Sequence, residues 1–460
     1  MATHVRYDVL VVGGGSAGCV LAARLSEDER RTVCLVEAGP DYGPYAAGGW
    51  PDDLLDPGAI PRSHRWYAEE TPYDPLRARV IGGCSAHNAC LLVRPPAADY
   101  DRWGEGWSAD ELAPHLDRAL RTIAPTPVVY SPDDFSPWFA GAAAAAEKVG
   151  LRLLEPDSPA EAAGVATGPF NIADGVRWNS AFAYLDPARR RPNLTILADT
   201  LVDRLVVDGD RATGVATSTS VLEAETMVLA AGAVGSPCIL RRSGVGREDE
   251  LRPLDIDVIA ALDGVGANLS DHATAWLEFE AADELREATR RKAPVLFSHG
   301  IIKARTELCA DDAFDVHILP ITSRVGDDAH LTVALMQPES RGRVRLTSRD
   351  PTAPPVVEHR LLSAERDRRV LEAGLALAER LASGGPLSRL GRARPVDGAL
   401  GIYFHPVGTC AIGSVVDHDA RVKGFENVYV ADASIMPTVP RANTHLTVLA
   451  IAEKIAEMLR

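Results

Sequence analysis

The chain opens with an apolar run that is followed by glycines and then by a helical pattern. Residues 7–12 are rich in β-branched side chains, and Leu21, Leu25 and their alanine neighbours repeat at helical spacing. A second β-rich run, residues 32–36, ends at Glu37. A strand, a glycine turn, a helix and a second strand are typical of the beginning of a doubly wound sheet.

Later parts of the chain alternate between strand-like and helical patterns. Residues 194–217 hold two apolar runs separated by Asp208-Gly209, which predicts a β-hairpin, and residues 226–237 predict a buried strand that enters a glycine-rich turn. Residues 275–350 contain five short apolar segments between polar breaks, which indicates an antiparallel sheet. Residues 363–383 predict one helix, because their apolar positions recur on one stripe.

This order of elements predicts an α/β fold with two interleaved domains. A Rossmann-type domain would be built from residues 1–95, 194–272 and 405–460. The stretches between them, residues 96–193 and 273–404, would form an α+β substrate domain on an antiparallel sheet. The parallel sheet would thus be assembled from three separate pieces of the chain.

Composition and charge narrow the classes of partner. The chain has 460 residues, 46% hydrophobic and 24% charged, which is typical of a globular protein. A net charge of −16 argues against nucleic acid and against an anionic membrane surface. No apolar run reaches the ~18–20 residues of a spanning helix, and the N-terminus shows no signal-peptide pattern. Seven cysteines without a Cys-x-x-Cys pair fit free thiols in a reducing cytoplasm, where we expect the protein to reside.

The first candidate motif is Gly13-x-Gly15-x-x-Gly18 followed by Glu37. Gly13 permits a tight turn, Gly15 lets the backbone approach a pyrophosphate at the helix N-terminus, and Gly18 allows close packing of helix and strand. Glu37 ends the second strand, where it can accept both hydrogen bonds of a ribose diol and repel a 2′-phosphate. The pattern predicts a dinucleotide site but does not separate NAD from FAD. A tight turn without a ligand is the alternative.

Two further segments have small residues beside polar ones. Residues 82–88, GGCSAHN, would let the backbone approach a flat ring, with a polar turn and an ordinary buried His87 as the alternative. Val430-Ala431-Asp432-Ala433-Ser434 predicts a strand that ends in an acid before a turn of small residues, which could bring backbone N–H groups and a carboxylate to the polyol of a cofactor. A capped turn is the alternative there.

Two histidines near the C-terminus form the last candidate. His405 lies in HPVGT and His445 in NTH, forty residues later, so they could meet only if the tail folds back on the first sheet. One imidazole could then take a proton while the other donates a hydrogen bond. Two unrelated structural histidines are the alternative, as is a metal pair lacking its other ligands; we predict no metal site.

Taken in order, these segments resemble the glucose–methanol–choline (GMC) family of FAD-dependent oxidoreductases. The resemblance runs from about Tyr7 to Ile455 and is strongest in the cofactor-binding pieces. It implies FAD rather than NAD, and hydride transfer from an alcohol to flavin N5. It is carried by the segments YDVLVVGGGSAG, RVIGGCSAHNACLLVRPP, VLAAGAVGSP, GVGANLSDH, HPVGTC, VYVADASIMPT and NTHLTVLAIAEK.

The resemblance also assigns individual residues. GGCSAHNAC is most similar to the choline oxidase version of the segment, which implies a covalent link between His87 and the flavin 8α-methyl group. Thr274 is implied to line the substrate pocket, and Tyr403 and Phe404 are expected there because they precede His405, with core packing as the alternative for the two aromatic residues. The cofactor-binding positions implied by the family are Gly13, Gly15, Ser16, Ala17, Gly18, Glu37, Ala38, Gly83, His87, Asn88, Ala89, Val202, Ala231, Asp432, Ala433 and Thr447.

By the same resemblance His405 takes the hydroxyl proton and His445 hydrogen-bonds the alkoxide oxygen, or the two roles are exchanged. Other family members use a histidine and an asparagine as this pair. Tyr403 and Phe404 precede His405 directly, and an aromatic wall would suit a benzylic or heteroaromatic primary alcohol. Thr274 stands where choline oxidases carry a glutamate that faces the ammonium group, so choline itself is disfavoured.

Several alternatives stay open at this point. The electron acceptor is oxygen or another oxidant, a sugar or polyol dehydrogenase fits the same motifs, and a homodimer is left open. Some GMC proteins cleave hydroxynitriles with no net flavin turnover, and the same residues could deprotonate that substrate. A non-catalytic scaffold or an NAD enzyme would leave the later motifs without a role. The chain is short for the family, so we expect a trimmed substrate domain.

Overall fold

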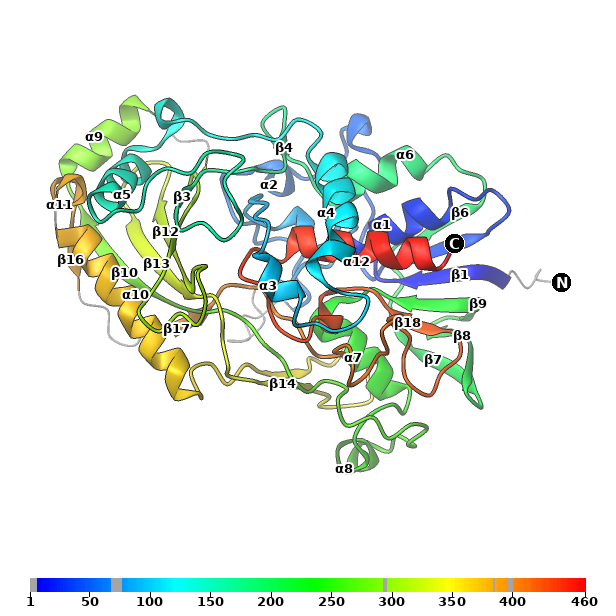
Figure 1. Cartoon of the computed structure of the whole chain (residues 1–460). Helices are drawn as coiled ribbons and strands as arrows, with labels where there is room; N and C mark the ends of the chain where they lie inside the picture. The colour runs from blue at the N-terminus through cyan, green and yellow to red at the C-terminus, as the bar shows by residue number, and fades with distance from the viewer. Residues whose placement is uncertain (1–5, 68–76, 293–295, 384, 395–399) are drawn as a thin grey trace.

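The computed structural model describes residues 6–67, 77–292, 296–383, 385–394 and 400–460 (Figure 1). Two large sheets lie toward opposite ends of the molecule, with α1 (Ser16–Leu25) and α12 (His445–Met458) beside the first and α10 (Glu365–Ser383) along the second. The mixed α/β architecture predicted from the sequence is confirmed. The domain boundaries given above stay a prediction.

The first sheet combines parallel and antiparallel pairs. Strands β6, β2, β1, β9 and β18 pair in parallel, and β7 and β8 extend the sheet as the predicted hairpin at Asp208-Gly209. The interior of β1 is buried on both faces, which its continuous apolar run requires. The order is β6 (Leu194–Leu197), β2 (Val33–Val36), β1 (Arg6–Val12), β9 (Val221–Leu229), β8 (Arg211–Thr217) and β7 (Val202–Asp208), with β18 (Val428–Val430) also on β9.

The second sheet is antiparallel throughout, and α5 (Pro137–Lys148) and α10 bury one of its faces in a separate apolar core. Four of the five segments predicted for it join it. The fifth pairs instead with residues 356–358, as β14 (Arg343–Arg345) with β15 (Val356–Glu358). The order is β16 (Gly391–Arg394), β10 (Ala273–Ala281), β13 (Ala329–Leu335), β12 (Val316–Thr322), β11 (Ile301–Ala304) and β3 (Gly164–Ala166), with β17 (Leu400–Ile402) also on β10.

The remaining elements connect the two sheets or cover them. Helix α4 starts in a capping box, in which Ser108 and Glu111 satisfy each other's backbone N–H groups. Within the described ranges, no helix combines the length and apolar character that crossing a bilayer demands. The elements not yet given are β4 (Ile172–Ala173), β5 (Val176–Arg177), α2 (Asp52–Leu55), α3 (Ala97–Tyr100), α4 (Ala109–Ile123), α6 (Asp186–Ala188), α7 (Gly232–Arg242), α8 (Glu248–Leu251), α9 (Asp283–Arg291), α11 (Pro386–Leu390), and the short turns of helix η1 (Tyr45–Ala47), η2 (Gly83–Ala86), η3 (Pro132–Asp134), η4 (Ala181–Leu185), η5 (Arg252–Leu254) and η6 (Ala433–Ile435).

Candidate active site

The glycine turn between β1 and α1 has the geometry that its spacing predicts. Gly13 has a φ of +102°, which only glycine adopts readily. A Cβ on Gly18 would lie 1.8 Å from the carbonyl oxygen of Gly13, so this position needs glycine for packing. A Cβ on Gly15 would meet only the Cα of Gly83, at 3.8 Å. The backbone at Gly15 therefore leaves space in front of the helix N-terminus.

Glu37 lies against this turn. Its Oε2 accepts the N–H of Gly14 at 2.7 Å and its Oε1 accepts that of Gly39 at 2.8 Å. Burial raises the pKa of Glu37 to about 7, and these backbone hydrogen bonds oppose the rise. The carboxylate is thus fixed beside the glycines at the carboxyl end of β2.

The other predicted cofactor segments reach the same edge of the sheet. The last residues of β1, β9 and β18 are register partners, and Gly13, Ala231 and Asp432 follow them within two residues. Asp432 accepts hydrogen bonds from the Gly232 N–H at 2.9 Å and the Ser236 hydroxyl at 2.5 Å. Ligands of open α/β sheets bind at the carboxyl ends of the strands, where these groups gather.

The GGCSAHN segment packs directly on the glycine turn. The Gly82 N–H donates to the Gly14 carbonyl at 2.8 Å, and a Cβ on Gly83 would lie 2.6 Å from the Cα of Gly15. His87 follows η2 and is buried. The remaining predicted cofactor residues are Ser16 and Ala17 in the first turn of α1, Ala38 after Glu37, half-buried Asn88 and Ala89, Val202 at the start of β7, Ala433 in η6, and Thr447, which hydrogen-bonds Tyr100.

Four residues contact His405. Its Nε2 lies 3.3 Å from Nδ2 of Asn443, and its Nδ1 lies 3.0 Å from Nδ1 of His272. Its backbone N–H donates to Asp271 at 3.0 Å, and the ring centroid of Tyr403 lies 4.4 Å from that of His405. His405 is buried, so these four neighbours fix both the place and the orientation of the imidazole.

His405 and His445 have different hydrogen-bond partners in the structure. His445 is the first residue of α12, and its Nδ1 lies 3.1 Å from Nδ2 of Asn88 while its Nε2 lies 3.3 Å from the Ser180 hydroxyl. Both nitrogens of His445 are therefore engaged away from His405. Asn443, two residues before His445, contacts His405 instead, and the catalytic pair of His405 and His445 stays a prediction. Asn443 belongs to the same Asn-Thr-His tripeptide as His445, so the sequence motif already contained it.

Burial keeps these histidines neutral. Burial lowers the pKa of His405 to about 3 and that of His445 to about 4. The pKa of His272 lies well below its usual value, mainly because of burial and in addition because His405 and His317 are close to it. The Asn443 amide donates to Nε2 of His405, so Nε2 carries a lone pair and Nδ1 carries the proton. The Nδ1–H of His405 then donates a hydrogen bond to Nδ1 of His272.

The predicted pocket residues separate in the structure. Tyr403 packs against both His405 and His272, and Thr274 lies on β10 with 3% of its surface exposed. Phe404 is 47% exposed and has a φ of +63°, so its side chain does not share the surroundings of Tyr403. The backbone turns between the two residues, and the expectation that both aromatic rings line the substrate pocket stays a prediction.

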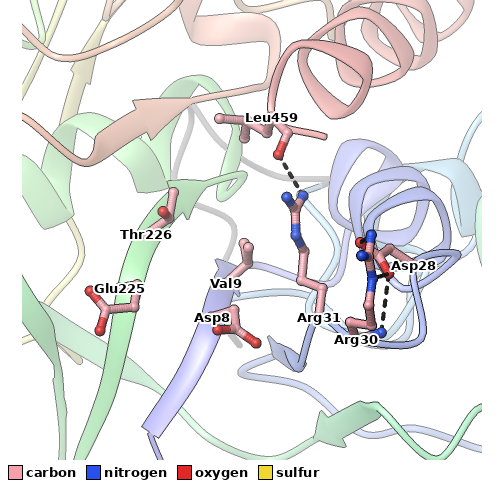
Figure 2. A pocket seen from close by; sticks show the side chains of 8 residues that line it. All are labelled: Asp8, Val9, Asp28, Arg30, Arg31, Glu225, Thr226 and Leu459. Carbon is pink, nitrogen blue, oxygen red and sulfur yellow. Dashed lines mark hydrogen bonds and ion pairs between the residues drawn. The ribbon is translucent and has the colours of Figure 1, made fainter.

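One open pocket lies at the other end of the strands. Figure 2 shows its lining at the start of β1 and in β9, with Arg31 reaching the carbonyl of Leu459. Its volume is about 410 Å³. None of the predicted cofactor or catalytic residues lines it, so it is not part of the candidate active site.

Comparisons with known proteins agree with this geometry. The N-terminal family model of the GMC oxidoreductases matches residues 7–274, and the C-terminal one matches residues 338–452. The chain belongs to the GMC oxidoreductase family. The predictions of the family, of FAD as cofactor and of an FAD-dependent enzyme acting on alcohols are thereby confirmed. The NAD alternative is set aside.

Relatives cover nearly the whole chain. An uncharacterised GMC-type oxidoreductase of Mycobacterium tuberculosis is 34% identical over 98% of this chain and 99% of its own length. An oxygen-dependent choline dehydrogenase of Escherichia coli is 31% identical over 99% and 96%. The pyridoxine 4-oxidase structure from Mesorbium loti has a TM-score of 0.86 and 26% identity, with 98% of this chain and 99% of that chain covered. The M. tuberculosis alignment spans 533 positions, so that relative carries segments which these 460 residues lack.

The residues of the sheet edge fit FAD. The space before α1 that a Cβ on Gly15 would fill suits a pyrophosphate, and the Glu37 carboxylate is fixed within reach of the same turn. Asp432 is anchored at the end of β18, next to the N-terminus of α7. Gly83 and Asn88 connect this edge to His445 and thus to the start of α12.

Proposed function

We propose that the enzyme oxidises a benzylic or heteroaromatic primary alcohol to the aldehyde, with His405 as proton acceptor and Asn443 as hydrogen-bond donor. The observation that carries this proposal is the 3.3 Å contact between Nε2 of His405 and Nδ2 of Asn443. When bound, FAD supplies the acceptor for the hydride of the alcohol carbon.

The chain's own residues provide the proton chemistry. The neutral His405 takes the hydroxyl proton on Nε2, while its Nδ1–H remains hydrogen-bonded to His272. The Asn443 amide, released from Nε2, donates to the substrate oxygen as negative charge grows on it. Asp271 fixes the backbone of His405 and thereby the direction of its ring.

The proposed substrate class is inferred from the side chains beside His405. Tyr403 offers an aromatic surface 4.4 Å from the His405 ring, which suits a flat substrate. The similar structure named pyridoxine 4-oxidase acts, by that name, on a heteroaromatic alcohol. Relatives named choline dehydrogenase are also similar, but Thr274 brings no carboxylate toward a quaternary ammonium group. These observations favour an uncharged or anionic aromatic alcohol over choline.

An anaerobic titration tests the proposal. The visible spectrum of the purified enzyme is recorded while primary, benzylic, heteroaromatic and sugar alcohols are added. We expect one aromatic class to bleach the oxidised flavin band, and re-admission of air then separates an oxidase from a dehydrogenase. A sugar that bleaches the band instead would favour the polyol alternative. A flavin that stays yellow with every alcohol would contradict the proposal, and cyanohydrin cleavage by the same sample would favour the lyase alternative.

We also propose that His87 carries the flavin covalently. His87 is buried directly after η2, on the segment that packs against Gly15. Acid precipitation of the wild-type enzyme should give a yellow pellet, because the link survives unfolding. His87→Ala is the control and should release its flavin into the supernatant. A colourless wild-type pellet under a yellow supernatant would exclude the link.

A further inference from the structure

The antiparallel sheet presents one row of side chains on the face that meets His405. Lys303 on β11 is the register partner of His317 on β12, and His317 is that of Ala334 on β13. Ala334 is in turn paired with Thr274 on β10. Register partners share a face of a sheet, and His272, two residues before Thr274, contacts His405 directly. The whole row therefore faces the candidate active site.

His317 is the unexplained member of this row. It is fully buried, and neither of its ring nitrogens has a hydrogen-bond partner among the residues that the structure describes. Its ring stacks on Phe314 at 5.1 Å and meets the edge of Tyr403 at 6.3 Å. Buried polar groups are almost always paired, so an imidazole with two unused nitrogens beside Tyr403 points to a ligand.

Lys303 gives this end of the row a positive charge. Its ammonium group is buried, donates to the Ala160 carbonyl at 3.0 Å, and lies 4.9 Å from the Phe314 ring centroid. Glu161, next to Ala160 on the same loop, is half-buried and partly offsets the charge. The ammonium has three N–H groups, and the Ala160 carbonyl accepts one of them.

The rest of the row is small and uncharged. Ala334 and Thr274 have short side chains, and Gly401, paired with Thr274, has none. The middle of the row therefore carries no charged side chain, with hydrogen-bonding groups at the Lys303 end and the proton acceptor His405 across Tyr403 from His317. A substrate bound against this row would meet a polar group at each end.

We propose that His317, backed by Lys303, is a specificity-determining residue that binds an anionic oxygen on the substrate. This inference rests on the proposed function and narrows it: the substrate is an aromatic alcohol with a second, acidic oxygen, such as a carboxylate or an ionised phenol. The neutral His317 donates one N–H to that oxygen, and the Lys303 charge favours the anion. A quaternary ammonium alcohol is disfavoured by the same charge.

The test compares an alcohol without an anionic group with three isomers that carry a carboxylate. Flavin reduction of the holoenzyme is measured anaerobically with benzyl alcohol and with the three isomers of hydroxymethylbenzoate. At limiting substrate, the flavin of the wild type should be reduced at least about tenfold faster by the best hydroxymethylbenzoate than by benzyl alcohol. His317→Phe should lose at least about tenfold of that preference while the rate with benzyl alcohol changes little.

Three variants complete the design. Lys303→Met should also lower the preference, and His317→Gln, which keeps a donor, should restore part of it. Ile318→Val is the matched control, because Ile318 is the neighbour of His317 on β12 and belongs to the core on the opposite face. An equal slowing of both alcohols by His317→Phe would assign a structural role instead and overturn the inference, as would an unchanged preference.

A binding measurement keeps this inference separate from the proposed function. Benzoate is titrated into the holoenzyme by calorimetry, which needs no turnover. We expect the dissociation constant to rise at least about tenfold in His317→Phe and to stay unchanged in Ile318→Val. If the wild type oxidises no alcohol, the proposed function fails while this titration still decides the anion site. Benzoate binding that is equal in the wild type and His317→Phe would overturn the site itself. If His317→Phe does not fold, His317→Gln and Lys303→Met carry the same comparison.

Discussion

Replacing His405 by alanine should slow anaerobic flavin reduction by ~10²–10⁴-fold, the range expected for loss of a general base. Its Nε2 carries the lone pair that Asn443 and His272 orient, and no other described histidine has a ring nitrogen beside the Asn443 amide. Stopped-flow reduction with the best alcohol from the titration measures the effect. Reduction of His405→Ala at the parent rate would show that the assigned role is wrong.

Alanine replacements of Asn443 and His445 separate the two candidate partners of His405. Asn443→Ala should slow reduction by about 10–100-fold, because one hydrogen bond to the developing charge is lost. His445→Ala should cost less, since its nitrogens are engaged by Asn88 and Ser180. If His445→Ala were the slower of the two, the pair expected from the sequence would be correct after all.

The acidity of His405 supplies a second readout. Burial lowers the pKa of His405 to about 3, so the base is already neutral near pH 6 and loses no activity to its own protonation there. An ordinary imidazole, with a pKa of about 6.5, would be largely protonated below that pH. The wild-type reduction rate should therefore not fall as the pH drops through about 6.5. A fall there that is absent in His405→Ala would contradict this expectation.

The sequence predicts well which segments meet at the carboxyl edge of the first sheet, because that arrangement depends on the backbone. The spacing of Gly13, Gly15 and Gly18 and the acid at Glu37 follow from strand and helix geometry alone. Parallel strands with matched ends then bring Asp432 to the same place, although it is distant in sequence. Neither step requires a side-chain rotamer to be known.

The residue whose side chain contacts His405 could not be predicted in the same way, because it depends on where α12 begins. Helix formation from His445 directs that side chain to Asn88 and Ser180 and leaves Asn443 in the preceding turn. A left-handed backbone at Phe404 likewise separates it from Tyr403. His317 gave no local signal either, since its surroundings are formed by strands that are adjacent only in the folded sheet.

The two glycines of the cofactor turn should respond differently to alanine. Gly18→Ala places a methyl group 1.8 Å from the Gly13 carbonyl oxygen, so α1 must move away from β1. We expect a loss of about 3 kcal/mol or more in the free energy of unfolding, and no flavin in the purified protein. Thermal unfolding of the apoprotein and the ratio of flavin to polypeptide absorbance measure the two effects.

Gly15→Ala should remove the flavin and spare the fold. In the protein the added methyl group meets only the Cα of Gly83, at 3.8 Å, and the φ of −76° at Gly15 suits alanine. The same methyl group would occupy the space in front of the helix N-terminus where the pyrophosphate approaches the backbone. Flavin content should fall at least about tenfold at unchanged apoprotein stability. Both variants are made in the His87→Ala background, so that a covalent link cannot conceal weakened binding. Full flavin content in Gly15→Ala would place the pyrophosphate elsewhere, because this turn could not then be in close contact with it.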